Sequence, residues 1–83
     1  GGILYGAMAE SVASEMGARR TAMNAANEEA VALYLQDRIG FYDIPDAVAA
    51  ALRLPVTAEP SQDDIFEADR LARAYTRERF SDR

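Results

Sequence analysis

No proline interrupts residues 3–38, a stretch that makes up almost half of the chain. Proline breaks helix interiors, so its absence leaves this stretch free to form one long helix. Alanine is abundant there and has the highest helix propensity of any residue. Apolar or small residues recur at heptad-like spacing in two rows, Tyr5, Val12, Ala26 and Leu33 in the first and Ala9, Met16, Met23 and Ala30 in the second. The pattern predicts a helix over 3–38 that packs along other helices.

Three residues bear on the course of this helix. Arg19 falls on the first apolar row, where a charged side chain is unexpected. Gly17 offers a point at which the helix could break, because glycine costs about 1 kcal/mol relative to alanine in a helix interior. Gly40 predicts the end of the helix, since glycine adopts the left-handed conformation of a helix C-terminus without steric cost.

Two shorter helices are predicted after Gly40. Pro45 suits the first turn of a helix, which we expect over residues 45–53. Ser61 can cap the backbone N–H of Asp64 at the start of a helix over 62–80. The faces that we expect to be buried consist of Ile44, Val48, Ala51 and Leu52 in the first of these helices, and of Ile65, Ala68, Ala72 and Tyr75, widened by Phe66 and Leu71, in the second.

The fold class that follows is all-α, because no segment shows the alternation typical of strands. We predict a small helical bundle of three helices, over 3–38, 45–53 and 62–80, or of four if the first helix breaks near Gly17. Residues 1–83 are expected to form a single helical domain. Gly1 and Gly2 are interpreted as a remnant of an expression tag, since the sequence does not begin with methionine.

The composition limits what such a domain can do. A chain of 83 residues buries a small core, and without cysteine or histidine it has neither disulfides nor the usual zinc ligands. A net charge of −5 argues against binding to nucleic acids and anionic membranes. Neither a membrane-spanning apolar run nor a signal peptide is recognisable, so we expect a soluble cytoplasmic protein.

Acidic side chains are the main candidates for chemistry. Asp63, Asp64 and Glu67 fall in the first turns of a predicted helix, where acidic residues complement the helix dipole. Glu28 and Glu29 lack a neighbouring histidine or glycine-rich loop, as do Glu10 and Glu15, and are interpreted as solvated helix faces. We therefore expect no enzymatic activity, no cofactor, no bound metal and no small-molecule substrate.

Asn24 and Asn27 stand out because asparagine competes for backbone hydrogen bonds inside a helix. Our preferred interpretation is a buried polar contact that determines how neighbouring helices meet. Their side chains are expected to matter for the specificity of packing rather than for catalysis.

The residues around these asparagines resemble a known family. Several short motifs are similar to the C-terminal helical domain of 1-deoxy-D-xylulose 5-phosphate reductoisomerase. They are NAANE at 24–28, Ala30 and Val31, RIGF at 38–41, DIP at 43–45, EPS at 59–61 and DDI at 63–65. The resemblance covers about 22–78 and is extended to the domain limits 22–83. It implies a supporting helical bundle, and the NADPH-binding domain, the metal-binding carboxylates and the phosphate-binding residues of that family have no counterparts in this sequence.

The N-terminal part resembles another family. Over about 3–26 it is similar to the C-terminal helix of the rotary ATP synthase gamma subunit. The similarity is carried by Leu4 to Ala7, by Glu10 and Ser11, and by the run from Ala13 to Met23. Two unrelated resemblances in one chain predict an engineered chimera made by bacterial expression, a helical bundle without biochemical activity. Two alternatives stay open: a helix-pairing interaction module, and a supporting domain of a reductoisomerase that lacks its catalytic part.

The unequal lengths of the helices predict an assembly. A helix over 3–38 would be about 54 Å long and one over 62–80 about 28 Å, so half of the first helix would be left uncovered. Its apolar residues are Leu4, Tyr5, Met8, Val12 and Met16. We expect these five to form the interface of an antiparallel homodimer. A fold back at Gly17 into a compact monomer is the alternative.

Overall fold

The computed structural model contains three helices, α1 over Gly2–Leu35, α2 over Asp43–Ala51 and α3 over Gln62–Phe80. It describes residues 2–55 and 60–80, with side chains from residue 15 onward, and these residues form no strand. The prediction of an all-α bundle of three helices is confirmed. The helix predicted over 45–53 lies two residues earlier, and the one predicted over 62–80 has the expected bounds.

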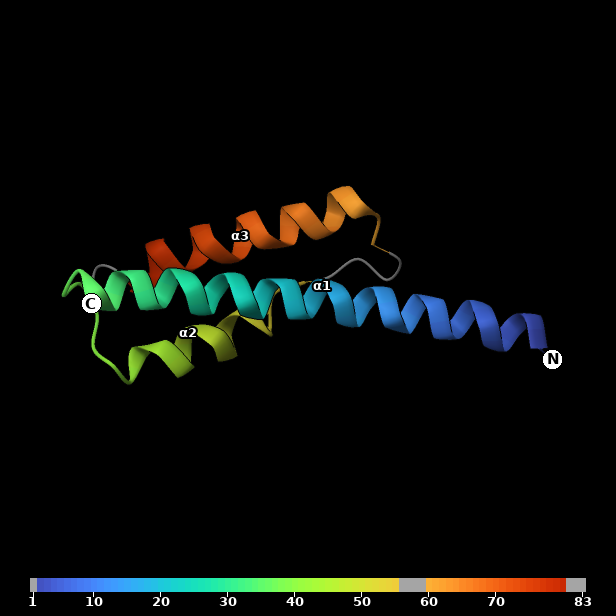
Figure 1. Cartoon of the computed structure of the whole chain (residues 1–83), viewed down its shortest axis with the longest axis horizontal. Helices are drawn as coiled ribbons and strands as arrows, with labels where there is room; N and C mark the ends of the chain where they lie inside the picture. Colours follow the sequence, from blue (N-terminus) through green and yellow to red (C-terminus); the bar gives the residue numbers. More distant parts are fainter. Residues whose placement is uncertain (1, 56–59, 81–83) are drawn as a thin grey trace.

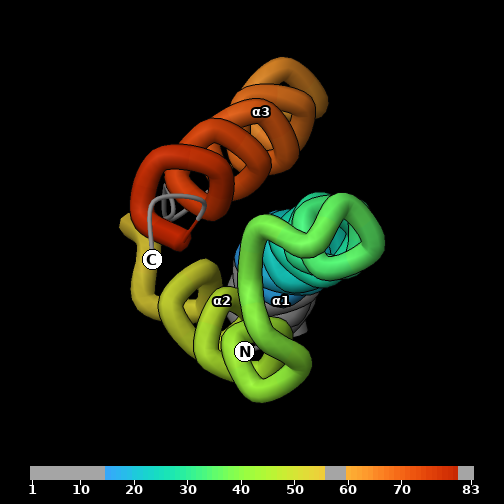
Figure 2. The backbone as a smooth tube through the Cα atoms, turned by 90° about the vertical axis from the view of Figure 1, so that its left-hand side faces the viewer, coloured from blue at the N-terminus to red at the C-terminus, as the bar shows by residue number. Residues whose placement is uncertain are grey.

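The arrangement of the helices is asymmetric. α1 runs the length of the molecule, whose longest dimension is 53 Å. Both α2 and α3 lie against the C-terminal half of α1, on different sides of it (Figures 1 and 2). The N-terminal half of α1 extends past the bundle (Figure 1). α2 runs antiparallel to α1 and α3 runs parallel to it (Figure 1). The backbone of α1 is continuous through Gly17. The four-helix alternative, which needs a break there, is therefore not the fold that the structure shows.

The end of α1 differs from the prediction. The helix ends at Leu35 and not at Arg38, and the residue with a positive φ, 59°, is Asp37 and not Gly40. The N–H of Arg38 donates to the carbonyl of Leu33 at 2.9 Å, and that of Asp37 donates to the carbonyl of Tyr34 at 3.0 Å. This pair of bonds defines a Schellman cap, with aspartate in the left-handed position that glycine usually takes.

Alanine predominates in the core between the helices. One cluster joins Ala22, Ala25 and Ala26 of α1 to Ala51 of α2 and Ala72 of α3. A second cluster lies nearer the end of the bundle and contains Ala30, Leu33, Ile39, Ala47 and Phe80. Because alanine adds only a methyl group to the backbone, the three helices can approach one another closely. The abundance of alanine thus serves helix packing as well as helix propensity.

Several residues that were expected on buried faces lie at the surface. Met16 and Met23 of the second apolar row are 58% and 37% exposed, and Phe66 of α3 is 65% exposed. In α2 the buried residues are Ala47 and Ala51, whereas Leu52 is exposed.

Polar side chains hold the helix ends. Arg19 donates to the carbonyl of Leu52 at 3.0 Å and to Glu15 at 3.2 Å, so this charge on the apolar row satisfies the end of α2. Ser61 and Asp64 form the predicted cap of α3 reciprocally, the N–H of Asp64 donating to Ser61 Oγ at 3.2 Å and the N–H of Ser61 to Asp64 Oδ2 at 2.9 Å.

The cap of α1 yields a stability prediction. Replacing Asp37 by Gly should raise the free energy of unfolding by about 1 kcal/mol, because glycine adopts positive φ without strain and a negative charge leaves the negative end of the helix. Urea denaturation measures the change. An Asp37→Asn variant separates the removal of the charge from the relief of strain.

Gly40→Ala is the matched control for Asp37→Gly. A Cβ atom at position 40 would meet Asp43 Oδ2 at 3.6 Å, an ordinary contact, so we expect little change in stability. A larger loss from Gly40→Ala than gain from Asp37→Gly would contradict this account of the α1 cap.

Candidate functional site

The two acidic residues that follow Asn24 in the sequence, Glu28 and Glu29, form ion pairs. Glu28 accepts a hydrogen bond from Arg73 of α3 at 2.7 Å, and Glu29 lies 3.2 Å from Arg77, also of α3. Arg73 binds Asp69 of its own helix as well, at 2.8 Å. The hydrogen bonds to Asp69 and Glu28 raise the pKa of the Arg73 guanidinium above its ordinary value. The carboxylates of Glu28 and Glu29 therefore join α1 to α3. The prediction had placed them on a solvated helix face without a structural role.

Two further carboxylates, those of Glu67 and Asp43, have local partners. Glu67 pairs with Arg70 one turn along α3, and this hydrogen bond lowers the pKa of Glu67 below its usual range. Asp43 accepts a hydrogen bond from the N–H of Gly40 at 2.8 Å. Among the residues that the structure describes, no group of three or more acidic side chains is placed to hold a metal ion. The Asp43 contact lies at the start of α2, and the Glu67 pair lies within α3.

The interpretation of Asn24 and Asn27 as buried contacts is wrong. Both side chains are exposed. Asn24 donates a long hydrogen bond of 3.4 Å to Glu28, four residues along the same helix. The two asparagines lie on the side of α1 that neither α2 nor α3 covers, so they do not determine how these helices meet.

A groove lies between α2 and α3. Its central part, of about 360 Å³, is lined by Leu54, Pro55, Leu71, Ala74, Tyr75 and Glu78. A second hollow has Tyr75 in common with this central part and continues toward Phe80. A third hollow has Leu71 and Pro55 in common with the central part and continues toward Asp64. Because neighbouring hollows share residues, they form one groove along α3, which we call the α2–α3 groove.

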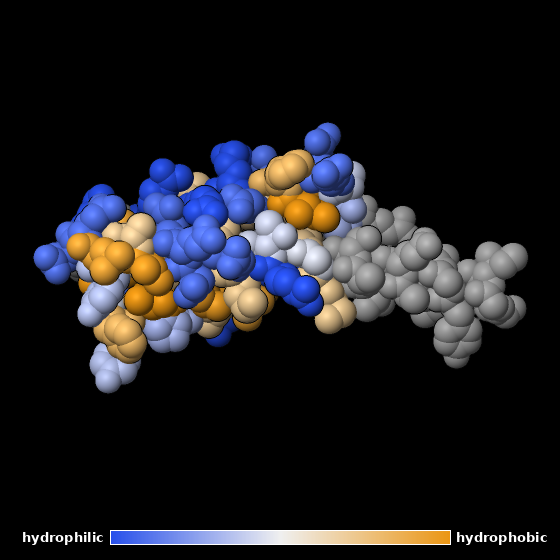
Figure 3. Space-filling model, viewed as in Figure 1, coloured by the Kyte–Doolittle hydropathy of each residue, from blue (hydrophilic) through white to orange (hydrophobic). Residues whose placement is uncertain are grey.

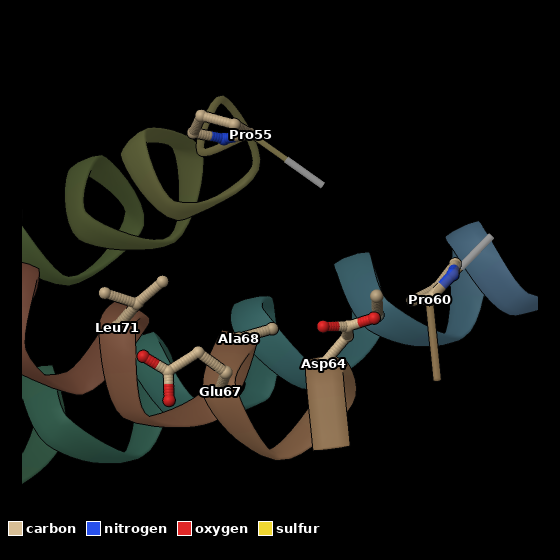
Figure 4. A pocket seen from close by; sticks show the side chains of 7 residues that line it. Pro55, Pro60, Asp64, Glu67, Ala68 and Leu71 are labelled. Carbon is tan, nitrogen blue, oxygen red and sulfur yellow. The ribbon is translucent and has the colours of Figure 1, made fainter. Parts of the chain in front are cut away.

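Figure 4 shows the part of the α2–α3 groove near the start of α3. Leu71, Ala68, Glu67 and Asp64 follow one another along α3, and Pro55 lies opposite, beyond the end of α2. The central part of the groove is apolar except for Glu78, and Leu71 there is 46% exposed. Charged side chains line both ends of the groove, Asp46, Arg53 and Arg79 at one end and Asp64 and Glu67 at the other, so its apolar character is confined to the central part.

The α2–α3 groove was not predicted from the sequence. Leu71 and Tyr75 were expected in the buried stripe of α3, yet the residues buried in this helix are Ala72, Thr76 and Phe80. The predicted stripe of α3, once widened by Phe66 and Leu71, makes an arc broader than one neighbouring helix covers. That width is the signal by which the sequence could have indicated a second contact surface on α3.

The five residues predicted to form a dimer interface lie in the extended half of α1. The backbone of Leu4, Tyr5, Met8 and Val12 is helical, and their side chains lie outside the described part of the structure. Met16 is described and is 58% exposed. The structure thus brings this segment onto one continuous helix and leaves Met16 available for contact.

A second apolar surface lies at the end of the bundle where α1 passes into α2 (Figure 3). Leu35 is 75% exposed there and Phe41 is 60% exposed. The ring of Phe41 packs edge-to-face against Tyr34 and against Tyr42, with centroids 5.8 and 5.7 Å away. None of the described helices is long and apolar enough to cross a membrane.

These features define a class of protein: a small helical bundle with an alanine-rich core, in which ion pairs join the first and third helices. The chain belongs to the family described as the DXP reductoisomerase C-terminal domain, whose model matches residues 5–75. The family resemblance inferred from the sequence is therefore confirmed for this domain. Because the match begins at residue 5, the same family also covers most of 3–26.

Individual relatives agree with the family. The 1-deoxy-D-xylulose 5-phosphate reductoisomerase of Synechococcus sp. (strain CC9902) is 48% identical over 62 residues, covering 71% of this chain and 15% of the relative. That of Synechococcus sp. (strain CC9605) is 40% identical over 74 residues, covering 86% of this chain and 18% of the relative. The reductoisomerase of Aeromonas hydrophila is 53% identical over 58 residues, covering 69% of this chain and 15% of the relative.

The chain spans less than one fifth of the length of these relatives, 15% and 18% of the first two. No solved structure matches the chain. Membership of the family thus identifies the kind of domain, and the activity of the whole enzymes is a matter for the proposal below.

The ion pairs between α1 and α3 can be tested by mutation. Arg73→Gln should lower the free energy of unfolding by roughly 1 kcal/mol at low salt, because it removes the bridge from α3 to Glu28 of α1. The effect should shrink in about 1 M NaCl, which screens partly exposed charges. Arg70→Gln is the control, since its partner Glu67 lies on the same helix, and it should change stability less. Equal effects of the two variants in urea denaturation would contradict the role of Arg73.

Proposed function

We propose that this chain acts as a non-catalytic supporting domain of a 1-deoxy-D-xylulose 5-phosphate reductoisomerase. The observation that carries the proposal is the family match, which runs without interruption over 5–75. The described charged groups fit a supporting role, because Glu28, Glu29 and Arg73 join helices to one another. In this proposal the reacting groups belong to the other parts of such an enzyme.

The engineered chimera that we predicted has less support than this alternative. The segment resembling the ATP synthase gamma subunit, 3–26, lies mostly inside the family match. One family therefore accounts for the chain without a second parent. An interaction module is compatible with a supporting domain, because the α2–α3 groove and the extended half of α1 both offer surfaces for helix contacts.

A graft tests the supporting role. In the reductoisomerase of Synechococcus sp. (strain CC9902), the matching segment would be replaced by residues 5–75 of this chain. We expect the graft to keep the relative's kcat within a few-fold, because supporting contacts and not reacting groups are exchanged. A version of the relative that ends before this segment is the control and should lose activity or solubility. A graft as inactive as this truncated control would contradict the proposal.

Ligand titration tests the absence of catalytic groups from this chain. The 83-residue chain contains neither histidine nor cysteine, and no glycine-rich phosphate loop is recognisable. Isothermal titration of the chain with NADPH, and separately with Mg²⁺ or Mn²⁺, should give no saturable heat. Stoichiometric binding with a micromolar Kd would show that the domain carries a binding site of its own.

A further inference from the structure

The motif RIGF at 38–41 contains one residue that the fold of this chain does not use. Ile39 is buried in the core, and the N–H of Gly40 donates to Asp43 at the start of α2. Phe41, by contrast, is 60% exposed. An exposed phenylalanine adds nothing to the core of its own domain, so its side chain is available for contact with another surface.

The stretch NAANE at 24–28 shows the same division. Its two alanines are buried in the core, and its glutamate binds Arg73 of α3. Asn24 and Asn27 are exposed, and the hydrogen bond that Asn24 donates within its own helix is long, 3.4 Å. The two amide side chains thus have little part in holding the three helices together.

The exposed residues of both motifs lie along one surface. Asn24, Asn27, Val31 and Leu35 follow one another at spacings of three or four residues, which places them on one face of α1. The end-on view shows one side of α1 free of both α2 and α3 (Figure 2). Phe41 continues this face beyond the end of the helix, with its ring against that of Tyr34. The outer surface of α1, as we call it below, consists of Asn24, Asn27, Val31, Tyr34, Leu35 and Phe41.

The chemistry of this outer surface suits burial against protein. Its six side chains are aliphatic, aromatic or amide groups, and none carries a charge. The neighbouring charges of Glu28 and Glu29 are paired with arginines of α3. Arg20, four residues before Asn24, borders the surface at one end. Centres of protein interfaces are enriched in aromatic residues and depleted of charge, while their rims are polar.

The apolar end of the outer surface is fixed in place by contacts within the chain. The ring of Phe41 lies edge-to-face against Tyr34 and Tyr42. The backbone beneath it is held by the cap at the end of α1 and by the 2.8 Å bond between Gly40 and Asp43. A surface that is already ordered loses little conformational entropy when a partner binds.

The size of the relatives indicates what covers this surface. The chain matches 15% and 18% of the first two reductoisomerases, so more than four fifths of each lies outside the match. The family is described as a C-terminal domain, which places most of that length before the matched segment. The preceding part thus joins the domain at α1, and it can pack along the outer surface without displacing α2 or α3.

We propose that the outer surface of α1 is the surface by which this domain packs against the preceding part of a reductoisomerase. The inference rests on the proposed supporting function and names its contact. The partner presents apolar side chains to Leu35 and Phe41, and hydrogen-bonding groups to the amides of Asn24 and Asn27. Burial of a neutral amide is tolerated when it is hydrogen-bonded, which makes these two asparagines suitable for such a contact.

Thiol labelling tests the surface with a matched pair of exposed phenylalanines. Phe41 is 60% exposed, and Phe66, on α3 and outside the outer surface, is 65% exposed. Phe41→Cys and Phe66→Cys are each made in the 83-residue chain, which has no cysteine, and in the graft described above. Mass spectrometry of the labelled peptide gives the rate of reaction with a maleimide. In the graft, Phe41→Cys should react roughly 10-fold more slowly than in the isolated chain, and Phe66→Cys at an unchanged rate.

The labelling rate and the activity of the graft are separate measurements. A graft that keeps the relative's kcat while Phe41→Cys reacts as fast as in the isolated chain would overturn the docking surface and leave the supporting function intact. An inactive graft in which Phe41→Cys is protected would do the reverse. Slow labelling of Phe41→Cys in the isolated chain would show that a second copy covers the surface, and equal slowing of both positions in the graft would show burial that is not specific to it. Either result would overturn the proposal.

Asn27→Ala adds a measurement that does not depend on labelling. In the isolated chain it should leave the thermal midpoint unchanged or raise it, because alanine is the better helix former. In the graft it should lower the midpoint by roughly 3 °C, because a group of the partner loses its hydrogen bond. Gln62→Ala, which removes an exposed amide of α3, is the control and should change neither protein. The same shift in both proteins, or none in the graft, would contradict the proposal.

Discussion

The close approach of three alanine-lined helices is the contact on which the rest of the structure depends. Ala22, Ala25 and Ala26 of α1 meet Ala51 of α2 and Ala72 of α3 with little side chain between the backbones. Such contacts gain from dense packing, but each alanine buries little apolar area, and hydrophobic stabilisation grows with buried area. The largest fully buried side chain is that of Thr76, whose hydroxyl donates to the carbonyl of Ala72 at 2.8 Å. A core of this kind specifies how the helices fit together more than it stabilises them.

The polar contacts around this core follow from its small size. Arg73 and Arg77 hold α3 against Glu28 and Glu29, and Arg19 holds the end of α2. Partly exposed ion pairs contribute little individually, so they supplement the core and do not replace it. A small core also leaves the wider apolar arc of α3 unburied, and this is why Leu71 and Tyr75 line a groove. The same feature that allows close packing therefore leaves Leu71 of α3 exposed.

The sequence predicted the helices better than their contacts. The absence of proline from 3–38 and the cap formed by Ser61 were sufficient for the helix class and for the start of α3, because these signals are local. Which face of a helix is buried depends on the neighbouring helix. Alanine occurs on several faces of α1, and the sequence alone could not show that Ala18 and Ala22 are buried while Met16 and Met23 are exposed. The α2–α3 groove was missed for the same reason, since a groove is a property of two helices at once.

The same alanine-rich pattern explains why the N-terminal segment resembles two families. A long helix that packs closely on its neighbours needs small residues at the contact positions, good helix formers between them and charged residues toward water. Residues 3–26 satisfy these requirements with alanine, serine, methionine and glutamate, a small set of residue types that the packing itself selects. Two unrelated long helices under the same requirement draw on the same few residue types, so a likeness between them does not imply a common origin. A local likeness of this kind is weak ground for a second parent, whereas a match that continues through the turn after Leu35, α2 and most of α3 depends on many different local requirements.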